Sequence, residues 1–309
     1  MRAKRRKKKR WLRWIGGIAA VLLVGAGIFA YSIYHNVKQT AKQMYENVDW
    51  KSEKRDEEVS VKEKMPISIL LIGVDERKGD KGRADSLIVM TVNPKKKSVE
   101  MVSVPRDTRT EIVGRGTQDK INHSYAFGGV EMTMATVEHF LDIPIDYYIK
   151  VNMESFRDIV DAVGGVTVDN PFAFTYEGTH FPKGKITLDG EKALKYSRMR
   201  YDDPRGDFGR QDRQKQIIEA IIEKGASFSS LANYDDVLAA IGKNIKTNLT
   251  FDEMKEIQAN YKEARHHIEQ LHITGKGKMI DGTYYLLVPE EERLAVSNKL
   301  KEHLELKTS

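Results

Sequence analysis

Residues 67–75, ISILLIGVD, form a continuous apolar run of strand-forming residues that ends in an aspartate. A run of this kind is typical of a β-strand that is buried on both faces. Residues 85–93 (DSLIVMTVN) and 98–105 (SVEMVSVP) have the same character, and the short basic turn 94–97 between them predicts a hairpin. The sequence therefore predicts that a buried sheet begins at residue 67.

Segments with helical spacing alternate with further strands in the rest of the chain. In residues 209–224, for example, isoleucines recur at helical spacing and Gly225 follows as a stop signal. Helices are expected at 128–141, 153–163, 209–224, 251–264 and 290–304, and further strands at 146–151, 165–168, 268–273 and 283–288. This mixed order, with a hairpin near its start, predicts an α/β fold, namely an α/β/α sandwich with a central mixed sheet.

A basic tail directly precedes one apolar segment near the N-terminus. Residues 2–13 hold nine Lys and Arg side chains, and the twenty residues 15–34 hold no charge. As a helix, the apolar segment would reach about 30 Å, the thickness of a bilayer's hydrocarbon core. The positive-inside rule then predicts a cytoplasmic tail at 1–14, one transmembrane signal-anchor helix at 15–34 and an exported remainder. A cleaved signal peptide and a nucleic-acid-binding arm are the alternative interpretations.

Charge and composition restrict the function of the exported part. The nine tail charges exceed the net charge of +6, so residues 14–309 carry a net charge of −3 and give no reason to expect nucleic acid. The absence of cysteine excludes thiol catalysis and means that the fold depends on its hydrophobic core. Residues 35–65 are strongly charged, which predicts a partly helical stalk, and the exported domain is expected at 66–309.

The densest polar cluster is SRMRYDDPRGDFGRQDRQ, residues 197–214, with five Arg and four Asp. Arg210 and Arg213 fall near the N-terminus of the predicted helix, where free backbone N–H groups and the helix dipole favour an anion such as phosphate. Gln214 shares the helix face of Arg210. A solvated loop of Arg–Asp salt bridges is the alternative interpretation.

Further polar residues lie at the ends of the predicted strands. Asp75 ends the first strand, Asp85 opens the second, and VPRDT (104–108) ends the third. Such residues converge on one edge of a sheet, where α/β proteins bind ligands. Two aspartates beside phosphate-binding arginines suit Mg²⁺, although capping of strand ends or turns would explain the aspartates equally well.

The histidines are not expected to carry the chemistry. His123 follows Lys120, a candidate further cation, and is interpreted as a structural hydrogen-bonding residue rather than a base. The pair His266 and His267 lacks a carboxylate at ligand spacing, so no zinc site is expected there.

Four separated motifs within residues 67–225 resemble those of the LytR–CpsA–Psr family. They are RADSLIV (83–89), VPRDT (104–108), KINHSYAFGG (120–129) and SRMRYDDPRGDFGRQDRQ (197–214). The resemblance implies a phosphotransferase on the outer face of the cell membrane of a Gram-positive bacterium. Such an enzyme moves an anionic glycopolymer, such as wall teichoic acid, from an undecaprenyl pyrophosphate carrier to N-acetylmuramic acid of peptidoglycan.

The resemblance also implies roles for individual residues. The pyrophosphate-binding set would be Arg83, Arg106, Arg198, Arg200, Arg210 and Gln214, to which the sequence adds Lys120. The catalytic residues would be Arg106, Arg198 and Arg200, with Asp107 as a candidate proton acceptor. Asp75 and Asp85 would hold Mg²⁺, or Mn²⁺ in its place.

Two other functions stay open at this point. A magnesium-dependent pyrophosphatase that releases the lipid phosphate to water would use the same arginines and aspartates. A non-enzymatic, membrane-bound transcriptional regulator would contact DNA through the basic tail. The chain has no Walker-type phosphate loop, and an exported domain would meet no ATP, so the expected phosphate source is lipid-linked.

Overall fold

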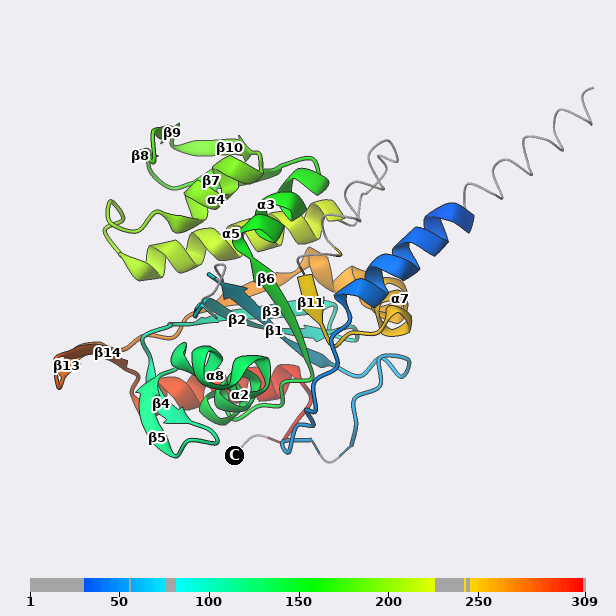
Figure 1. The fold of residues 1–309 in the computed structure, drawn as a ribbon, viewed down its shortest axis with the longest axis horizontal. Helices are drawn as coiled ribbons and strands as arrows, with labels where there is room; N and C mark the ends of the chain where they lie inside the picture. The colour runs from blue at the N-terminus through cyan, green and yellow to red at the C-terminus, as the bar shows by residue number, and fades with distance from the viewer. Residues whose placement is uncertain (1–30, 56, 76–81, 226–241, 243–244, 308–309) are drawn as a thin grey trace, which may run out of the picture.

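A central sheet of six strands organises the structure, a computed structural model that describes residues 31–55, 57–75, 82–225, 242 and 245–307 (Figure 1). Its strand order is β11-β6-β1-β2-β3-β12. The strands are β1 (Ile67–Val74), β2 (Ala84–Asn93), β3 (Ser98–Val104), β6 (Tyr147–Asn152), β11 (Ile245–Thr247) and β12 (Ile268–Leu271). β1 runs parallel to β6, and β3 parallel to β12, whereas the other pairs are antiparallel. The predicted mixed sheet and the β2–β3 hairpin are confirmed.

Both faces of this sheet are buried, as the continuous apolar runs predicted. Leu70 and Ile72 of β1 pack on one face against α2 (His123–Leu141) and α8 (Glu290–His303). Ile67 and Ile69 pack on the other face, against the region of α7 (Phe251–Asn260), η2 (Lys262–His266) and one side of α5 (Asp207–Gly225). The expected α/β/α layering follows from this alternation along each strand.

A second apolar cluster lies on the far side of α5 (Figure 1). It is built from α3 (Met153–Ala162), α4 (Gly190–Arg198), β7 (Val166–Asn170), β8 (Phe174–Tyr176), β9 (Thr179–Phe181) and β10 (Gly184–Leu188). Ile217 of α5 points into this cluster, while Ile218 and Ile222 pack towards the sheet. Helix α5 is therefore shared by two cores, and both cores fix its position.

Several element boundaries differ from the sequence prediction. Helix α2 begins at His123 and is kinked at Gly128 and Gly129, where Gly129 has a φ of +66°. Helix α5 begins at Asp207, and the expected helix 251–264 is divided into α7 and η2. The unpredicted elements are α4, β8, β9, β10, β11, β4 (Arg109–Ile112), β5 (Thr117–Lys120) and β13 (Lys276–Ile280), which pairs with β14 (Thr283–Leu287). Most are strands of three to five residues, too short to show a periodic apolar pattern.

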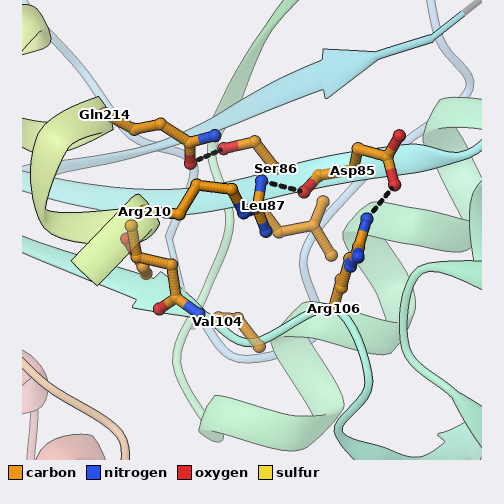
Figure 2. Close-up of a pocket in the computed structure, with 9 residues that line it drawn as sticks. Asp85, Ser86, Leu87, Val104, Arg106, Arg210 and Gln214 are labelled. Atoms are coloured by element: carbon orange, nitrogen blue, oxygen red, sulfur yellow. Dashed lines mark hydrogen bonds and ion pairs between the residues drawn. The ribbon is translucent and has the colours of Figure 1, made fainter. Parts of the chain in front are cut away.

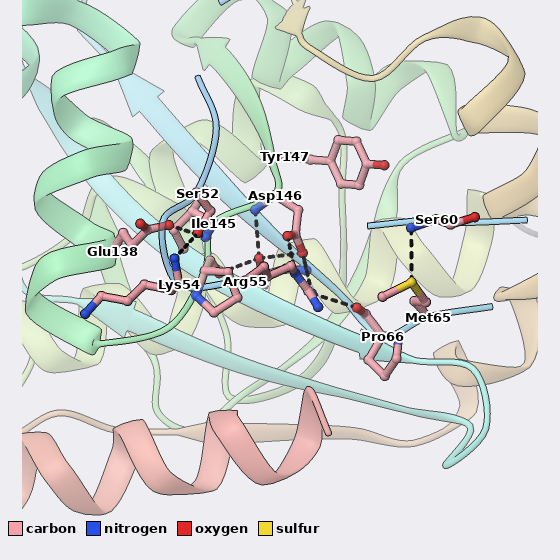
Figure 3. A network of polar contacts seen from close by, with 12 residues as sticks. Ser52, Lys54, Arg55, Ser60, Met65, Pro66, Glu138, Ile145, Asp146 and Tyr147 are labelled. Atoms are coloured by element: carbon pink, nitrogen blue, oxygen red, sulfur yellow. Dashed lines mark hydrogen bonds and ion pairs between the residues drawn. The ribbon is translucent and has the colours of Figure 1, made fainter. Parts of the chain in front are cut away.

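The segment 35–65, expected to be a partly helical stalk, makes several contacts with the domain. Residues 31–44 are helical. The indole of Trp50 then donates a hydrogen bond to the Ile145 carbonyl at 2.8 Å. The guanidinium of Arg55 pairs with the carboxylate of Asp146 at 2.6 Å, and both side chains are buried (Figure 3). Val61 is also buried, within the core on the α7 side of the sheet. A few residues therefore anchor this segment to the domain, although most of its residues are polar.

The predicted membrane span at 15–34 lies outside the described residues, apart from residues 31–34. The basic tail at 1–14 lies outside them entirely. In the part of the chain that the structure describes, no helix combines the length and apolar character needed to cross a bilayer. The anchor and the topology stay predictions.

A buried ion pair fixes the connection between α4 and α5. Arg213 and Asp203 lie 2.5 Å apart, with side chains 2% and 1% exposed. Arg213 also donates to the backbone carbonyls of Met199 and Tyr196, so it holds the end of α4 as well. Gly209 completes the contact, since a Cβ there would come within 1.9 Å of Asp203 Oδ2. The end of α4 with Arg198, and the following loop with Arg200, are thereby held against α5.

We expect Arg213→Met and Gly209→Ala each to lower the free energy of unfolding substantially. Arg213→Met leaves the buried Asp203 carboxylate without its partner, which typically costs about 3–5 kcal/mol. Gly209→Ala places a methyl group where that carboxylate lies. Urea unfolding of the full-length protein measures both effects. Arg157→Ala is the control, because Arg157 pairs with Glu191 at 3.5 Å on the surface and its loss should cost about 0–1 kcal/mol. Equal effects for Arg213→Met and Arg157→Ala would contradict the structural role of the buried pair.

Candidate functional site

A β-bulge at the start of β2 re-aims the side chain of Asp85. Gly73 pairs with Ser86 and Val74 pairs with Ala84, so Asp85 is the extra residue between the two pairs. Bulges bend the strand and redirect side chains, and they are common next to active sites. Asp85 Oδ1 accepts a hydrogen bond from Arg106 Nη1 at 2.8 Å. The bulge therefore brings the second strand's aspartate to the arginine that follows the third strand.

A small pocket opens beside this pair, between the sheet and the first turns of α5 (Figure 2). Ser86 Oγ donates to Gln214 Oε1 at 3.0 Å, and Arg210 Nη1 donates to the Asp85 carbonyl at 3.3 Å. These bonds join α5 to β2 across the pocket. The lining residues are Asp85, Ser86, Leu87, Ser103, Val104, Arg106, Arg210, Gln211 and Gln214. The predicted convergence of Asp85, Arg106, Arg210 and Gln214 is found in the structure.

Asp207 is the anion around which the cationic groups gather at the start of α5. Arg210 binds its two carboxylate oxygens through Nε at 2.8 Å and Nη2 at 3.2 Å. Gln211 donates to it at 3.1 Å, and Arg200 Nε lies 3.8 Å from it. Burial alone would raise the pKa of Asp207, but the hydrogen bonds and charge of Arg210 outweigh it and lower that pKa. The sequence predicted an anion at this helix start, and in the structure the chain's own carboxylate lies there.

The carboxylates of Asp207 and Asp85 stabilise the charged form of Arg106. Burial disfavours its charged form, yet the nearby charges of Asp207 and Asp85 raise the pKa of Arg106. Asp107 lies next to it and is held by two cations. Lys120 Nζ lies 2.6 Å from Asp107 Oδ1, and Arg106 Nε lies 3.9 Å from Asp107 Oδ2. The predicted residues Arg106, Asp107 and Lys120 therefore form one connected group at the end of β3.

Other residues singled out in the sequence are placed elsewhere. Arg198 Nη1 lies 3.8 Å from Glu177 in the turn between β8 and β9, and Arg198 does not line the pocket. Arg83 is exposed and directly precedes β2. Arg213 is buried in its pair with Asp203, which corrects the expectation that it joins the anion site. It lies on the side of α5 that faces the second cluster rather than the pocket.

The two predicted metal ligands lie at the same end of adjacent strands. The backbone N–H of Asp75 donates to the Arg83 carbonyl at 3.3 Å, so the end of β1 runs beside the start of β2. Carboxylate oxygens are the donors that Mg²⁺ prefers, and one or two of them suffice when substrate phosphate and water complete the shell. Among the described residues, no cluster of three or more His, Cys, Asp or Glu side chains could hold a metal without such help. The donor set therefore fits a metal that binds together with phosphate.

Sequence reasoning missed the roles of Ser86 and Gln211, which line the pocket, and of Asp207, which binds Arg210 beside it. Asp207 precedes Arg210 by three residues, the spacing of a helical ion pair, so this signal was present. It was overlooked because the predicted helix started too late, at residue 209. Ser86 gave no signal, since its role depends on the bulge at Asp85.

Known proteins resemble this chain in both sequence and fold. A protein of Bacillus subtilis (strain 168) named polyisoprenyl-teichoic acid–peptidoglycan teichoic acid transferase TagU is 56% identical over 306 residues, which is 99% of this chain and 100% of the relative. An Enterococcus faecalis structure described as a transcriptional regulator has a TM-score of 0.74 and 42% identity, covering 81% of this chain and 92% of that one. A structure described as TagT bound to LI-WTA has a TM-score of 0.71 and 32% identity, covering 82% and 96%.

The sequence profile of the LytR_cpsA_psr family matches residues 31–302. The match extends well beyond the motif region 67–225, and it includes the N-terminal segment that packs on the domain. With a near full-length relative at 56% identity as well, the chain belongs to the LytR–CpsA–Psr family.

Proposed function

We propose that this protein is a phosphotransferase that moves a wall teichoic acid from a polyprenyl pyrophosphate carrier to peptidoglycan. The observation that carries the proposal is the identity of 56% over 99% of the chain to a relative named for teichoic acid transfer to peptidoglycan. The pocket supports it independently. Its guanidinium groups already bind carboxylates, and a pyrophosphate presents a higher density of the same charge in the same place.

The site's residues suit the charge changes of phosphoryl transfer. Such a reaction needs neutralisation of the leaving phosphate and positioning of the acceptor hydroxyl. Arg106 and Arg210 supply guanidinium forks on two sides of the pocket. Gln214 accepts from Ser86 through Oε1, which leaves its amide N–H groups as donors. Pyrophosphate would replace Asp85 and Asp207 as partner of the two arginines, while Arg200 and Arg198 stay predicted members of the binding set.

Asp75 and Asp85 are the residues that we propose to hold Mg²⁺, or Mn²⁺ in its place. A bound ion would neutralise pyrophosphate charge. Asp85 would then exchange its partner Arg106 for the metal, and Arg106 would be released towards the phosphate. The bulge at Asp85 supports this assignment, because it turns the carboxylate to the same edge as the end of β1.

Two other functions give different results in simple assays. A pyrophosphatase would release polyprenyl phosphate at the same rate with or without peptidoglycan. A transcriptional regulator, as one structural relative is described, would have to contact DNA through the basic tail and would leave the arginine pocket unexplained. Transfer of polymer to peptidoglycan in a purified system would exclude both as the main function.

We further propose a single-pass membrane anchor at 15–34 with residues 1–14 in the cytoplasm. The support is the twenty-residue uncharged segment and the nine basic residues that precede it. External protease added to intact protoplasts should then digest the folded domain. Protection in intact protoplasts, with digestion only after lysis, would contradict both the topology and the transfer reaction.

We expect Arg106→Ala and Arg210→Ala to reduce the transfer rate by roughly 30- to 1000-fold. A positioned charge-assisted contact to developing charge is worth about 2–4 kcal/mol. Transfer from a lipid pyrophosphate donor to peptidoglycan measures the effect, and Arg157→Ala is the control because its guanidinium pairs with Glu191 on the surface. Arg210→Ala should also lower the melting temperature slightly, since it removes the partner of Asp207. Wild-type rates in both pocket variants would refute the proposed pyrophosphate site.

We expect Asp85→Asn to lower the metal-stimulated rate by on the order of 100-fold, because a metal ion supplies several kcal/mol of charge stabilisation. The change keeps the size of the side chain and leaves an acceptor for Arg106, so the fold should survive. Titration of the rate with Mg²⁺ is the measurement, and Asp252→Asn on the surface of α7 is the control. An unchanged Mg²⁺ response in Asp85→Asn would remove this residue from the metal site.

A further inference from the structure

A histidine–aspartate pair lies near the proposed pyrophosphate site, outside the set of residues that would bind pyrophosphate or metal. His123 Nδ1 and Asp119 Oδ2 are 2.9 Å apart, at the start of α2 and in β5. A carboxylate only accepts hydrogen bonds, so Nδ1 carries the hydrogen and Nε2 keeps its lone pair. Among the described residues, Nε2 makes no hydrogen bond. The side chain of His123 is 27% exposed, so its ring is partly accessible to solvent.

The backbone carries His123 to the edge of the proposed site. The N–H groups of Ile121 and Asn122 donate to the carbonyls of Thr108 and Arg106, at 2.8 and 3.3 Å. The segment before His123 therefore runs along the segment that follows β3. The side chains make the same connection, since Lys120 pairs with Asp107 at 2.6 Å.

The surroundings hold the imidazole in one orientation. Asp119 accepts from Tyr285 Oη at 3.3 Å and from the Lys120 N–H at 2.7 Å, in addition to His123. Burial would raise the pKa of Asp119, but the hydrogen bonds from His123 and from the Lys120 backbone lower it. The ring of Phe127 packs edge-on against the His123 ring, with centroids 6.0 Å apart. The other charged groups on β4 and β5 are Lys120, Glu111 and Arg109, and Arg109 lies over the Tyr285 ring.

Asp107, the proton acceptor expected from the sequence, is less suited to that task. Its carboxylate is held by the ammonium of Lys120 and lies beside the guanidinium of Arg106. Both carboxylate oxygens of Asp107 therefore already have a cationic neighbour. His123 differs, because its Nδ1 is bound by the carboxylate of Asp119 and its Nε2 has no hydrogen-bond partner among the described residues.

We propose that His123, oriented by Asp119, takes the proton from the acceptor hydroxyl group in the transfer reaction. The hydroxyl oxygen forms a bond to the phosphorus that bears the polymer, and the bond from that phosphorus to the bridging oxygen breaks. The polyprenyl monophosphate leaves with the bonding electrons, and the hydroxyl proton passes to Nε2 of His123. The imidazolium ion then returns the proton to solvent. This inference rests on the proposed function and assigns the acceptor side of the same site.

The pH dependence of the rate distinguishes this role from a structural one. The wild-type kcat should fall at acid pH, because a protonated imidazole accepts no further proton. In His123→Gln, kcat should be lower by roughly 100- to 10,000-fold. The remaining rate should also lack the acid limb, that is, the fall of kcat at acid pH. The KM for the lipid pyrophosphate donor should stay unchanged. The assay uses full-length protein, a lipid-linked glycopolymer donor and peptidoglycan as acceptor.

Two further variants give the test its controls. Asp119→Asn keeps an acceptor for Nδ1–H but removes the charge that stabilises imidazolium, so its acid limb should move to lower pH. His139→Gln is the matched control, since His139 lies on the same helix, 4.0 Å from Glu111, and should leave both kcat and the limb unchanged.

A His123→Gln variant with wild-type kcat and an intact acid limb would refute the role of His123 alone. Loss of the limb in Asp107→Asn but not in His123→Gln would reassign the proton to Asp107. A wild-type protein that transfers no polymer would instead refute the proposed function itself.

Discussion

The buried pair of Arg213 and Asp203 is the constraint on which the site depends. Asp203 lies in the loop between α4 and α5, and Arg213 lies nearly two turns into α5. Their contact, together with the absence of a side chain at Gly209, presses the loop against the helix. Because α5 is itself fixed between two cores, its contact with the loop fixes the position of the loop as well. Arg200 is thereby brought to Asp207, and Asp207 to Arg210.

Different side chains of helix α5 line the pocket, pack in two cores and bind the sheet. Arg210, Gln211 and Gln214 line the pocket. Ile217 belongs to the second cluster and Ile218 to the core on the α7 side of the sheet. Lys215, which is almost fully buried, donates to the Leu271 carbonyl at the end of β12, and burial lowers its pKa. A helix that is packed in this way can present Arg210 to a ligand from a fixed backbone, as in preorganised electrostatic sites that stabilise developing charge.

The charges of the site are balanced within the protein. Asp85 neutralises Arg106, and Asp207 neutralises Arg210, so the cations are stable in a partly buried place. In the proposed reaction, a pyrophosphate would compete with these carboxylates for the same hydrogen-bond donors. Its higher charge density would favour the exchange, and a metal held by the released Asp85 would favour it further. We therefore propose that the binding of pyrophosphate and the binding of a metal are coupled through the ion pair of Asp85 with Arg106.

The sequence by itself determined the buried sheet, the β2–β3 hairpin, the mixed α/β architecture and most of the arginines of the pocket. These features are local, because apolar runs and charged motifs consist of consecutive residues. The α2 motif around His123 was noticed too, but its partner Asp119 and the role of the pair were not. A hydrogen bond between a helix start and a neighbouring hairpin strand has no periodic signal.

Only the tertiary structure decided which of these residues meet. The bulge that turns Asp85 towards Arg106 depends on the register between β1 and β2. The burial of Arg213 depends on a loop that folds back on α5, although in the sequence Arg213 looks the same as Arg210. The docking of residues 35–65 rests on a few anchors such as Trp50 and Arg55, within a segment whose average composition is that of a solvated linker. In each case the deciding contact joins residues whose meeting depends on the packing of several elements, and that packing is set by the whole core.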